Sequence, residues 1–391
     1  MEPENGRPVH DESPSYESAI LPAPAGSSLE RADGAAPEPR SRDLRWVFIG
    51  SHGLRAGWTV AIFLAIMFAL TGGLDYLFAQ AGLVNFKHQF APKSAFFSEL
   101  AGLLALLGAA WLTARIEHRH ILDYNLRGPR RVSHFFAGLV TGFAALSALV
   151  GTMAWGGWMH FGPVALSGKA ILLYAAIWGG TFLMVGCVEE GIVRCFLLAT
   201  LTRGVNFWWA GGLVALMCGD LLWRAKGNGV WGVYVMALAG VLPCLWLQLK
   251  EAPGTGFWNA AWLTSTLFGF GHVSNNGENW IGILGAASIG FVFCVSIRLT
   301  GSAWWAIGCH ASWDWAETYF YGTADSGLVA KGHLLTTTPA GSAFWSGGTA
   351  GPEGSVLVLG IILLLLIALL ALYGRRPASS VASAPTEQAA G

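Results

Sequence analysis

Three apolar stretches of this 391-residue chain carry ionisable residues, where long apolar runs usually have none. They contribute Glu189, Glu190 and Arg194 from the first stretch, His272 four residues after Phe268 from the second, and His310, Asp314 and Glu317 from the third. Placing a charge at the centre of a membrane helix costs about 2.5–3.5 kcal/mol on insertion scales. The three stretches therefore predict a shared polar interior that serves a chemical or transport function.

The spacing of these residues suggests how they divide the work. Glu190 and Arg194 are four residues apart, so they share one helix face and can neutralise each other. Glu189 lies about 100° around the helix and is left free for another role, such as that of a general base. His310 and Asp314 are also four residues apart, so Asp314 can orient the imidazole or join it around a ligand.

Each motif taken alone also has a structural interpretation. A single Glu–Arg pair in a helical bundle more often stabilises packing or lines a substrate path than performs catalysis. His272 near the end of its stretch fits an interfacial histidine, and a His and an Asp four residues apart occur by chance. Three such motifs in this order favour a common site.

The composition predicts the elements that hold these residues. The chain is 54% hydrophobic and 12% charged, about half the usual charge of a soluble domain. We count ten apolar stretches that could span a membrane, roughly at 58–80, 95–116, 134–156, 171–200, 207–223, 229–249, 256–273, 280–298, 302–320 and 354–373. The runs are continuous and not alternating, which favours helices over a barrel. We therefore predict an all-α, polytopic membrane helical bundle of about 8–10 transmembrane helices with a polar intramembrane catalytic cavity.

The remaining charges predict domain boundaries and orientation. Residues 1–45 and 377–391 lack an apolar pattern and are expected to be disordered tails around a transmembrane domain at 46–376. Arginines concentrate in the loop 117–133 and beside both tails, which predicts that both termini are cytoplasmic, in a cell membrane. Most other acids, including Glu99, Asp325 and Glu353, fall in loops or towards the ends of apolar stretches and suggest no function.

Charge and cysteine content exclude several functions. The net charge is 0 without a basic stripe, so nucleic acid is not an expected partner. None of the six cysteines forms a Cys-x-x-Cys pair, so the sequence indicates neither a thiolate zinc site nor a disulfide framework. The expected partners are membrane lipid and a membrane-associated protein or peptide substrate, and the oligomeric state stays open.

The ordered motifs Glu-Glu-x-x-x-Arg, Phe-x-x-x-His and His-x-x-x-Asp resemble those of the CPBP intramembrane proteases. This family of CAAX-protease and bacteriocin-processing (Abi) enzymes includes the type II CAAX prenyl endopeptidases. The resemblance covers about residues 170–325 and implies a helical core that hydrolyses a peptide bond within the membrane.

The resemblance also implies roles for six residues. Glu189 would activate the attacking water and His272 would help to hold it. His310 and Asp314 would stabilise the oxyanion or contribute to a metal site, and Glu190 with Arg194 would fix the first motif. The family is usually classed with metalloproteases, so Zn²⁺ or another divalent metal is a candidate cofactor. Its tentative ligands are Glu189, His272, His310 and Asp314, a set of nitrogen and oxygen donors that suits zinc.

The chain departs from the resemblance at two places. Asp314 stands where the prenyl endopeptidases have Asn. About 50 additional residues, roughly 205–254, separate the first two motifs, and their apolar character predicts an inserted helical hairpin.

We expect an intramembrane endopeptidase that acts on a membrane-associated or lipidated peptide or protein. The alternatives are a non-catalytic membrane scaffold and a transporter that uses the same polar cavity. The sequence shows neither an internal repeat nor a pair of broken helices in matching positions, which disfavours a transporter.

Overall fold

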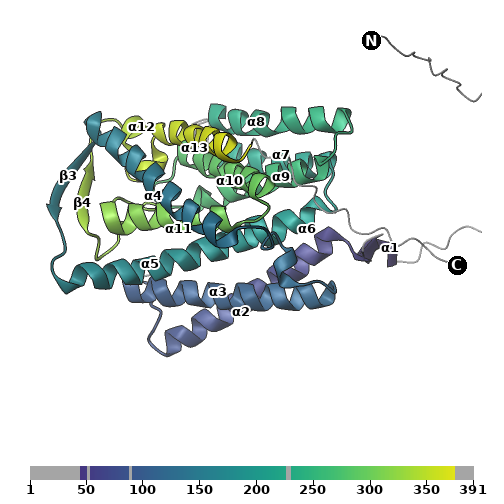
Figure 1. Ribbon diagram of the computed structural model, residues 1–391, viewed down its shortest axis with the longest axis horizontal. Coiled ribbons are helices and arrows are strands. Elements are labelled where there is room, and N and C mark those ends of the chain that lie inside the picture. The colour runs from purple at the N-terminus through teal and green to yellow at the C-terminus, as the bar shows by residue number, and fades with distance from the viewer. Residues whose placement is uncertain (1–44, 51–52, 88–89, 226–229, 375–391) are drawn as a thin grey trace, which may run out of the picture. The chain divides into compact units, whose positions relative to one another are not determined.

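The computed structural model describes residues 45–374 except 51–52, 88–89 and 226–229 (Figure 1). The first part of the chain forms α1 (Arg45–Phe48), β1 (Ile49–Gly50), β2 (Gly53–Leu54), α2 (Ala56–Gln80), α3 (Pro92–Ile116), the 3-10 turn η1 (Ile121–Asp123) and α4 (Arg131–Trp155). The middle part forms β3 (Met159–Val164), α5 (Lys169–Glu190), the π-helix η2 (Gly191–Leu197), α6 (Leu198–Thr202), α7 (Phe207–Ala225) and α8 (Val230–Leu249). The last part forms α9 (Thr255–Gly271), the 3-10 turn η3 (His272–Ser274), α10 (Trp280–Thr300), α11 (Trp304–Trp315), the π-helix η4 (Ala316–Tyr321), β4 (Leu335–Pro339), α12 (Ala343–Ser346), the 3-10 turn η5 (Pro352–Gly354) and α13 (Leu357–Tyr373).

Each of the ten predicted apolar stretches forms a helix, with ends that differ by a few residues from the prediction. Six helices in the described part of the chain are long and apolar enough to cross a membrane. They are α2, α3, α4, the continuous helix from α5 to α6, α8 and α10, and the shorter α13 is also apolar. The predicted polytopic all-α membrane bundle is thus confirmed. Residues 205–254, where we predicted an inserted hairpin, contain α7 and α8, which contact each other. The predicted disordered tails lie outside the described residues, apart from Arg45.

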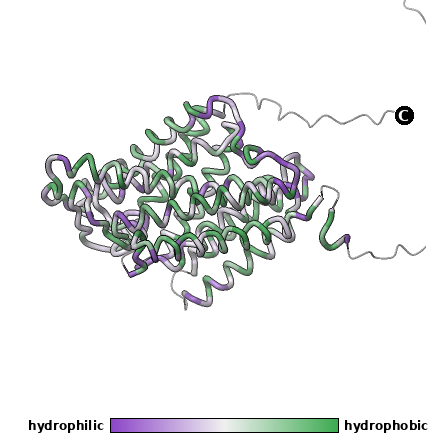
Figure 2. The backbone as a smooth tube through the Cα atoms, turned by 90° about the horizontal axis from the view of Figure 1, so that it is seen from below, coloured by the Kyte–Doolittle hydropathy of each residue, from purple (hydrophilic) through white to green (hydrophobic). Residues whose placement is uncertain are grey.

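The exposed side chains fit a lipid environment. Large apolar residues lie on the outside of the helices, among them Trp155, Trp223 and Leu172, which are 91%, 84% and 75% exposed. Apolar residues run along most of the helical length, whereas hydrophilic residues gather mainly near bends and helix ends (Figure 2). In water this surface would be unfavourable, but in a bilayer it faces hydrocarbon at no such cost.

Close packing of α4 on α11 positions the third motif. α11 lies between α4 and α5 and contacts both (Figure 1). Gly138 and Gly142 on α4 lie against backbone carbonyls of α11, so a Cβ atom at either position would collide with them. Gly308 on α11 lies equally close to the backbone of α4. Small residues four apart allow membrane helices to approach in this way, and here they fix the helix that carries His310 and Asp314.

Local irregularities of the helices lie next to the first and third motifs in the chain. α5, η2 and α6 form one continuous helix whose π-helical part begins directly after Glu190. η4 likewise continues α11 shortly after Asp314. π-helical turns are rare and occur often at functional sites. The antiparallel pair β3 and β4, with Met159 opposite Pro339, is a further element that the apolar pattern did not predict.

Candidate active site

A fully buried ion pair anchors the first motif. Arg194 Nε lies 3.3 Å from Glu190 Oε2, and neither side chain is exposed. The guanidinium also stacks over the ring of Phe268, with Cζ 4.0 Å from its centroid. Gly290 on α10 leaves room for the guanidinium, since a Cβ atom there would collide with Nη2. The predicted pairing of Glu190 with Arg194 is therefore confirmed, and it explains why the second motif contains a phenylalanine.

Glu190 also orients the histidine of the third motif. His310 Nδ1 lies 2.9 Å from Glu190 Oε1. A carboxylate only accepts hydrogen bonds, so Nδ1 carries the proton and donates it. This contact turns His310 Nε2 towards Glu189 Oε2 at 3.7 Å and Asp314 Oδ2 at 3.4 Å. The predicted proximity of His310 and Asp314 is confirmed, whereas the bond to Glu190 was not predicted.

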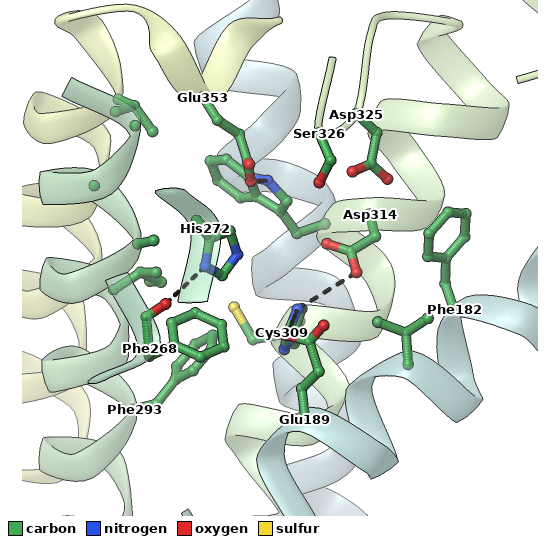
Figure 3. A pocket seen from close by; sticks show the side chains of 18 of the residues that line it. Phe182, Glu189, Phe268, His272, Phe293, Cys309, Asp314, Asp325, Ser326 and Glu353 are labelled. Atoms are coloured by element: carbon green, nitrogen blue, oxygen red, sulfur yellow. Dashed lines mark hydrogen bonds and ion pairs between the residues drawn. The ribbon is translucent and has the colours of Figure 1, made fainter. Parts of the chain in front are cut away.

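His272 lies across the cavity from these residues (Figure 3). It occupies the first position of η3, where α9 ends, and its Nδ1 lies 2.7 Å from the Phe268 carbonyl oxygen. The carbonyl can only accept, so Nδ1 carries the proton and the Nε2 lone pair of the neutral ring is free. His272 forms no hydrogen bond or ion pair with Glu189, His310 or Asp314 within the described residues.

A cavity of about 250 Å³ joins four of the six predicted site residues, namely Glu189, His272, His310 and Asp314. The Glu189 side chain is 41% exposed, in contrast to fully buried Glu190. Glu190 and Arg194 lie behind the residues that line the cavity. They affect the cavity through the hydrogen bond that His310 donates to Glu190. The free position predicted for Glu189 agrees with this arrangement.

Three further acids line the same cavity, although we had interpreted them as loop or helix-end residues without a function. They are Glu99 on α3, Asp325 after η4 and Glu353 in η5. Trp313 Nε1 donates to Glu353 at 2.9 Å and Thr318 Oγ1 donates to Asp325 at 2.7 Å. No motif spacing links these residues to the others, so only the fold could reveal them.

Two of these acids, Asp325 and Glu353, lie outside the membrane-spanning helices. Burial and the nearby Glu353 carboxylate raise the pKa of Asp325 to about 6. Burial also raises the pKa of Glu353, against the opposing effects of His272 and the Trp313 hydrogen bond. This part of the cavity therefore holds two carboxyl groups that form no ion pair with a lysine or arginine among the described residues.

The four predicted metal ligands are not grouped as a metal site among the described residues. Among residues 45–374, as far as they are described, no three His, Cys, Asp or Glu side chains are grouped so that they could hold a metal ion. His272 makes its one hydrogen bond with its own helix and lies apart from the pairs around His310 Nε2. We therefore derive no catalytic step through a metal.

Part of the chain that contains this site resembles a known protein family. Residues 170–316 match the family model described as type II CAAX prenyl endopeptidase Rce1-like. This segment of the chain is therefore similar to that family. It spans α5 to the start of η4 and contains all six predicted site residues, whereas Glu99, Asp325 and Glu353 lie outside it. Comparisons with curated proteins and with solved structures gave no match. At the family level, the Rce1-like segment supports a multi-pass membrane protease.

Proposed function

We propose that the chain is an intramembrane endopeptidase that hydrolyses a peptide bond of a membrane-associated or lipidated peptide or protein. The observation that carries the proposal is the division of the two adjacent glutamates. Glu190 is fully buried and contacts Arg194 and His310. Glu189 faces a cavity that His272 lines on the opposite side. Hydrolysis requires such a free base beside a second group that can hold water.

In the proposed mechanism a water molecule lies between Glu189 and His272. It donates one hydrogen bond to His272 Nε2 and loses its other proton to Glu189 as its oxygen attacks the peptide carbonyl. The C–O bond forms, the carbonyl π-electrons move to oxygen, and a tetrahedral oxyanion results. Protonated Glu189 then gives its proton to the leaving nitrogen as the C–N bond breaks. One carboxyl group thus serves as base and then as acid.

His310 stabilises the oxyanion in this mechanism. Its Nδ1–H is held by Glu190, so the ring cannot rotate away from the cavity. When Nε2 also carries a proton, it can donate to the oxyanion, and the adjacent Asp314 keeps the imidazolium in place. An ionised Asp314 would repel the oxyanion directly, so we assign Asp314 the role of orienting His310.

The experiment compares cleavage by purified wild-type protein and by Glu189→Gln and His272→Ala variants in detergent micelles. Two probes test the substrate class: a farnesylated peptide with a C-terminal CaaX sequence, and an unmodified transmembrane peptide. We expect wild-type cleavage of one of them and a loss of at least about 100-fold in each variant. Asp220→Asn on α7 alters an exposed pair with Arg224 and serves as the control. Unchanged turnover in both active-site variants would overturn the assignment.

A divalent metal such as Zn²⁺ is the competing explanation of the same residues, and chelation separates the two. Cleavage that survives 1,10-phenanthroline supports the metal-free mechanism. Cleavage that is lost on chelation and restored by zinc assigns Glu189, His272, His310 and Asp314 to metal binding.

We also propose a cell-membrane location with both termini cytoplasmic. The basic loop between α3 and α4 supports this orientation, since it contains Arg119, Arg127, Arg130 and Arg131. Thiol labelling of a cysteine introduced at Arg119 in intact cells tests it. Protection from an impermeant reagent is expected, and labelling would reverse the orientation.

A further inference from the structure

The wall of the cavity nearest the η4–α13 connection is acidic. Asp314, Asp325 and Glu353 all line this part of the cavity (Figure 3). They come from three separate segments: α11, the loop after η4, and η5. No lysine or arginine lines the cavity in the part of the chain that the structure describes. We call these three residues the acidic wall.

A fourth acid lies buried behind this wall. Glu317 in η4 is 1% exposed, and among the described residues neither of its carboxylate oxygens has a partner at full hydrogen-bond geometry, although Trp313 acts on it as a donor. Glu353, Asp325 and Asp314, the three members of the acidic wall, all repel a charge on this carboxyl. A buried carboxyl without a full hydrogen-bond partner in such a place is costly and requires an explanation.

The contrast with Glu190 shows what is missing. Glu190 is equally buried, but Arg194 supplies it with a cationic partner and His310 with a hydrogen-bond donor. The acidic wall receives mainly neutral donors, from Trp313 to Glu353 and from Thr318 to Asp325. His310 contacts Asp314, yet the same imidazole is already shared with Glu189 and Glu190. Within the described residues, a guanidinium therefore neutralises Glu190, whereas no lysine or arginine forms an ion pair with the acids of the wall.

The surrounding surface suits an organic cation with an apolar stem. Phe90 and Phe182 line the same cavity and can contact methylene groups or the cation itself. The Ser326 hydroxyl adds a further acceptor at the acidic side. A guanidinium can bond two carboxylates at once, and an ammonium can donate three hydrogen bonds. The carboxyls are not grouped for a metal ion within the described residues, so a larger, multi-donor cation fits better.

We infer that the acidic wall binds a positively charged side chain of the substrate, an arginine or lysine next to the scissile bond. The inference rests on the proposed peptidase function, because that function makes the bound cation part of a substrate. Asp325 and Glu353 lie outside the matched family segment and Asp314 lies inside it, so two of the three wall residues come from parts of the chain that the family match does not cover. The neighbouring Glu189 and His272 would then meet the peptide bond beside that side chain.

Binding is tested on the full-length protein in micelles by calorimetry, without any need for cleavage. The probes are acetyl-Leu-Arg-amide and the same dipeptide with citrulline, which has nearly the same shape but no charge. We expect the arginine probe to bind at least about tenfold more tightly to the wild-type protein. Equal affinities would overturn the inference, and this comparison does not depend on any variant.

Variants then locate the site. Asp325→Asn and Glu353→Gln should each reduce the preference for arginine to less than about threefold. Asp123→Asn removes an acid of the same type from a loop pair with Arg127 and should retain the full preference. A preference that survives in both wall variants would place the cation elsewhere. Displacement of the arginine probe by 1 mM Mg²⁺ or Ca²⁺ at constant ionic strength would identify an inorganic cation site and overturn the inference.

A cleavage assay joins the inference to the proposed function. Peptides that differ only by arginine or citrulline beside the scissile bond should differ at least about tenfold in kcat/KM. Glu353→Lys should reverse the preference in favour of a glutamate peptide. Charge-selective binding without any cleavage would refute the peptidase and retain the cation site, whereas cleavage without charge selectivity would do the opposite.

Discussion

Replacing Glu190 with glutamine should destabilise the protein strongly, because it leaves Arg194 charged in a fully buried position. Removing one member of a buried ion pair costs about 3–5 kcal/mol, since the other charge loses its partner. The Phe268 ring, 4.0 Å from the guanidinium carbon, offsets about 1–2 kcal/mol of that cost. The glutamine oxygen can still accept from Arg194 or His310, but not as strongly as a carboxylate. We therefore expect a net loss of about 1–4 kcal/mol in the free energy of unfolding.

The measurement is equilibrium unfolding in detergent micelles titrated with sodium dodecyl sulfate, followed by circular dichroism. A double-mutant cycle with Arg194→Met isolates the pair, and we expect a coupling of about 2–3 kcal/mol between the two positions. Asp220→Asn provides the matched control, because Asp220 and Arg224 have the same spacing but are 38% and 56% exposed. That change should cost less than about 1 kcal/mol. A loss in Glu190→Gln no larger than in Asp220→Asn would refute the reasoning.

Three further predictions concern the supports of the site. Gly142→Leu places a side chain against the carbonyl of Cys309 and should lower the free energy of unfolding by about 3 kcal/mol in the same assay. Gly151→Leu is the control and should be nearly neutral, because a side chain there meets open space on the same helix. Asn125 donates a 2.8 Å hydrogen bond to the carbonyl of Arg194, which lies in the π-helix η2. Asn125→Gly removes this bond and should lower the free energy of unfolding by about 1–3 kcal/mol. No loss would show that the bond does not stabilise η2. Asp325→Asn should leave the free energy of unfolding unchanged near pH 4 and increase it by about 1–3 kcal/mol at pH 7.5. The pKa of Asp325 is raised to about 6, so the stability of the wild-type protein falls as this carboxyl ionises between the two pH values. A gain that is independent of pH would contradict this.

The helices and the local pairs could be predicted because they depend on neighbours in the sequence. A run of apolar residues indicates a membrane helix whatever surrounds it. Residues four apart on a helix face the same side, so the pairs Glu190–Arg194 and His310–Asp314 follow from spacing alone.

Contacts between distant segments could not be predicted in this way. His310 reaches Glu190 across 120 positions because α11 packs against α5. Asp325 and Glu353 line the cavity although they come from the connection after η4 and from η5, and no apolar pattern encodes the path of these segments. The π-helical turns have no recognisable sequence signal either, although their position beside charged residues is a reason to look for them.

The buried guanidinium of Arg194 explains why the three motifs lie close together in the folded protein. It pairs with Glu190 on α5, stacks on Phe268 from α9 and fits against Gly290 on α10. Through Glu190 it also fixes His310 on α11. One cation therefore holds four helices in register, and it satisfies one of the two adjacent carboxylates. The other, Glu189, receives no share of that charge by direct contact, so it keeps a free carboxyl in the cavity. The same packing that stabilises the bundle thus leaves the Glu189 carboxyl at the cavity, with its side chain 41% exposed.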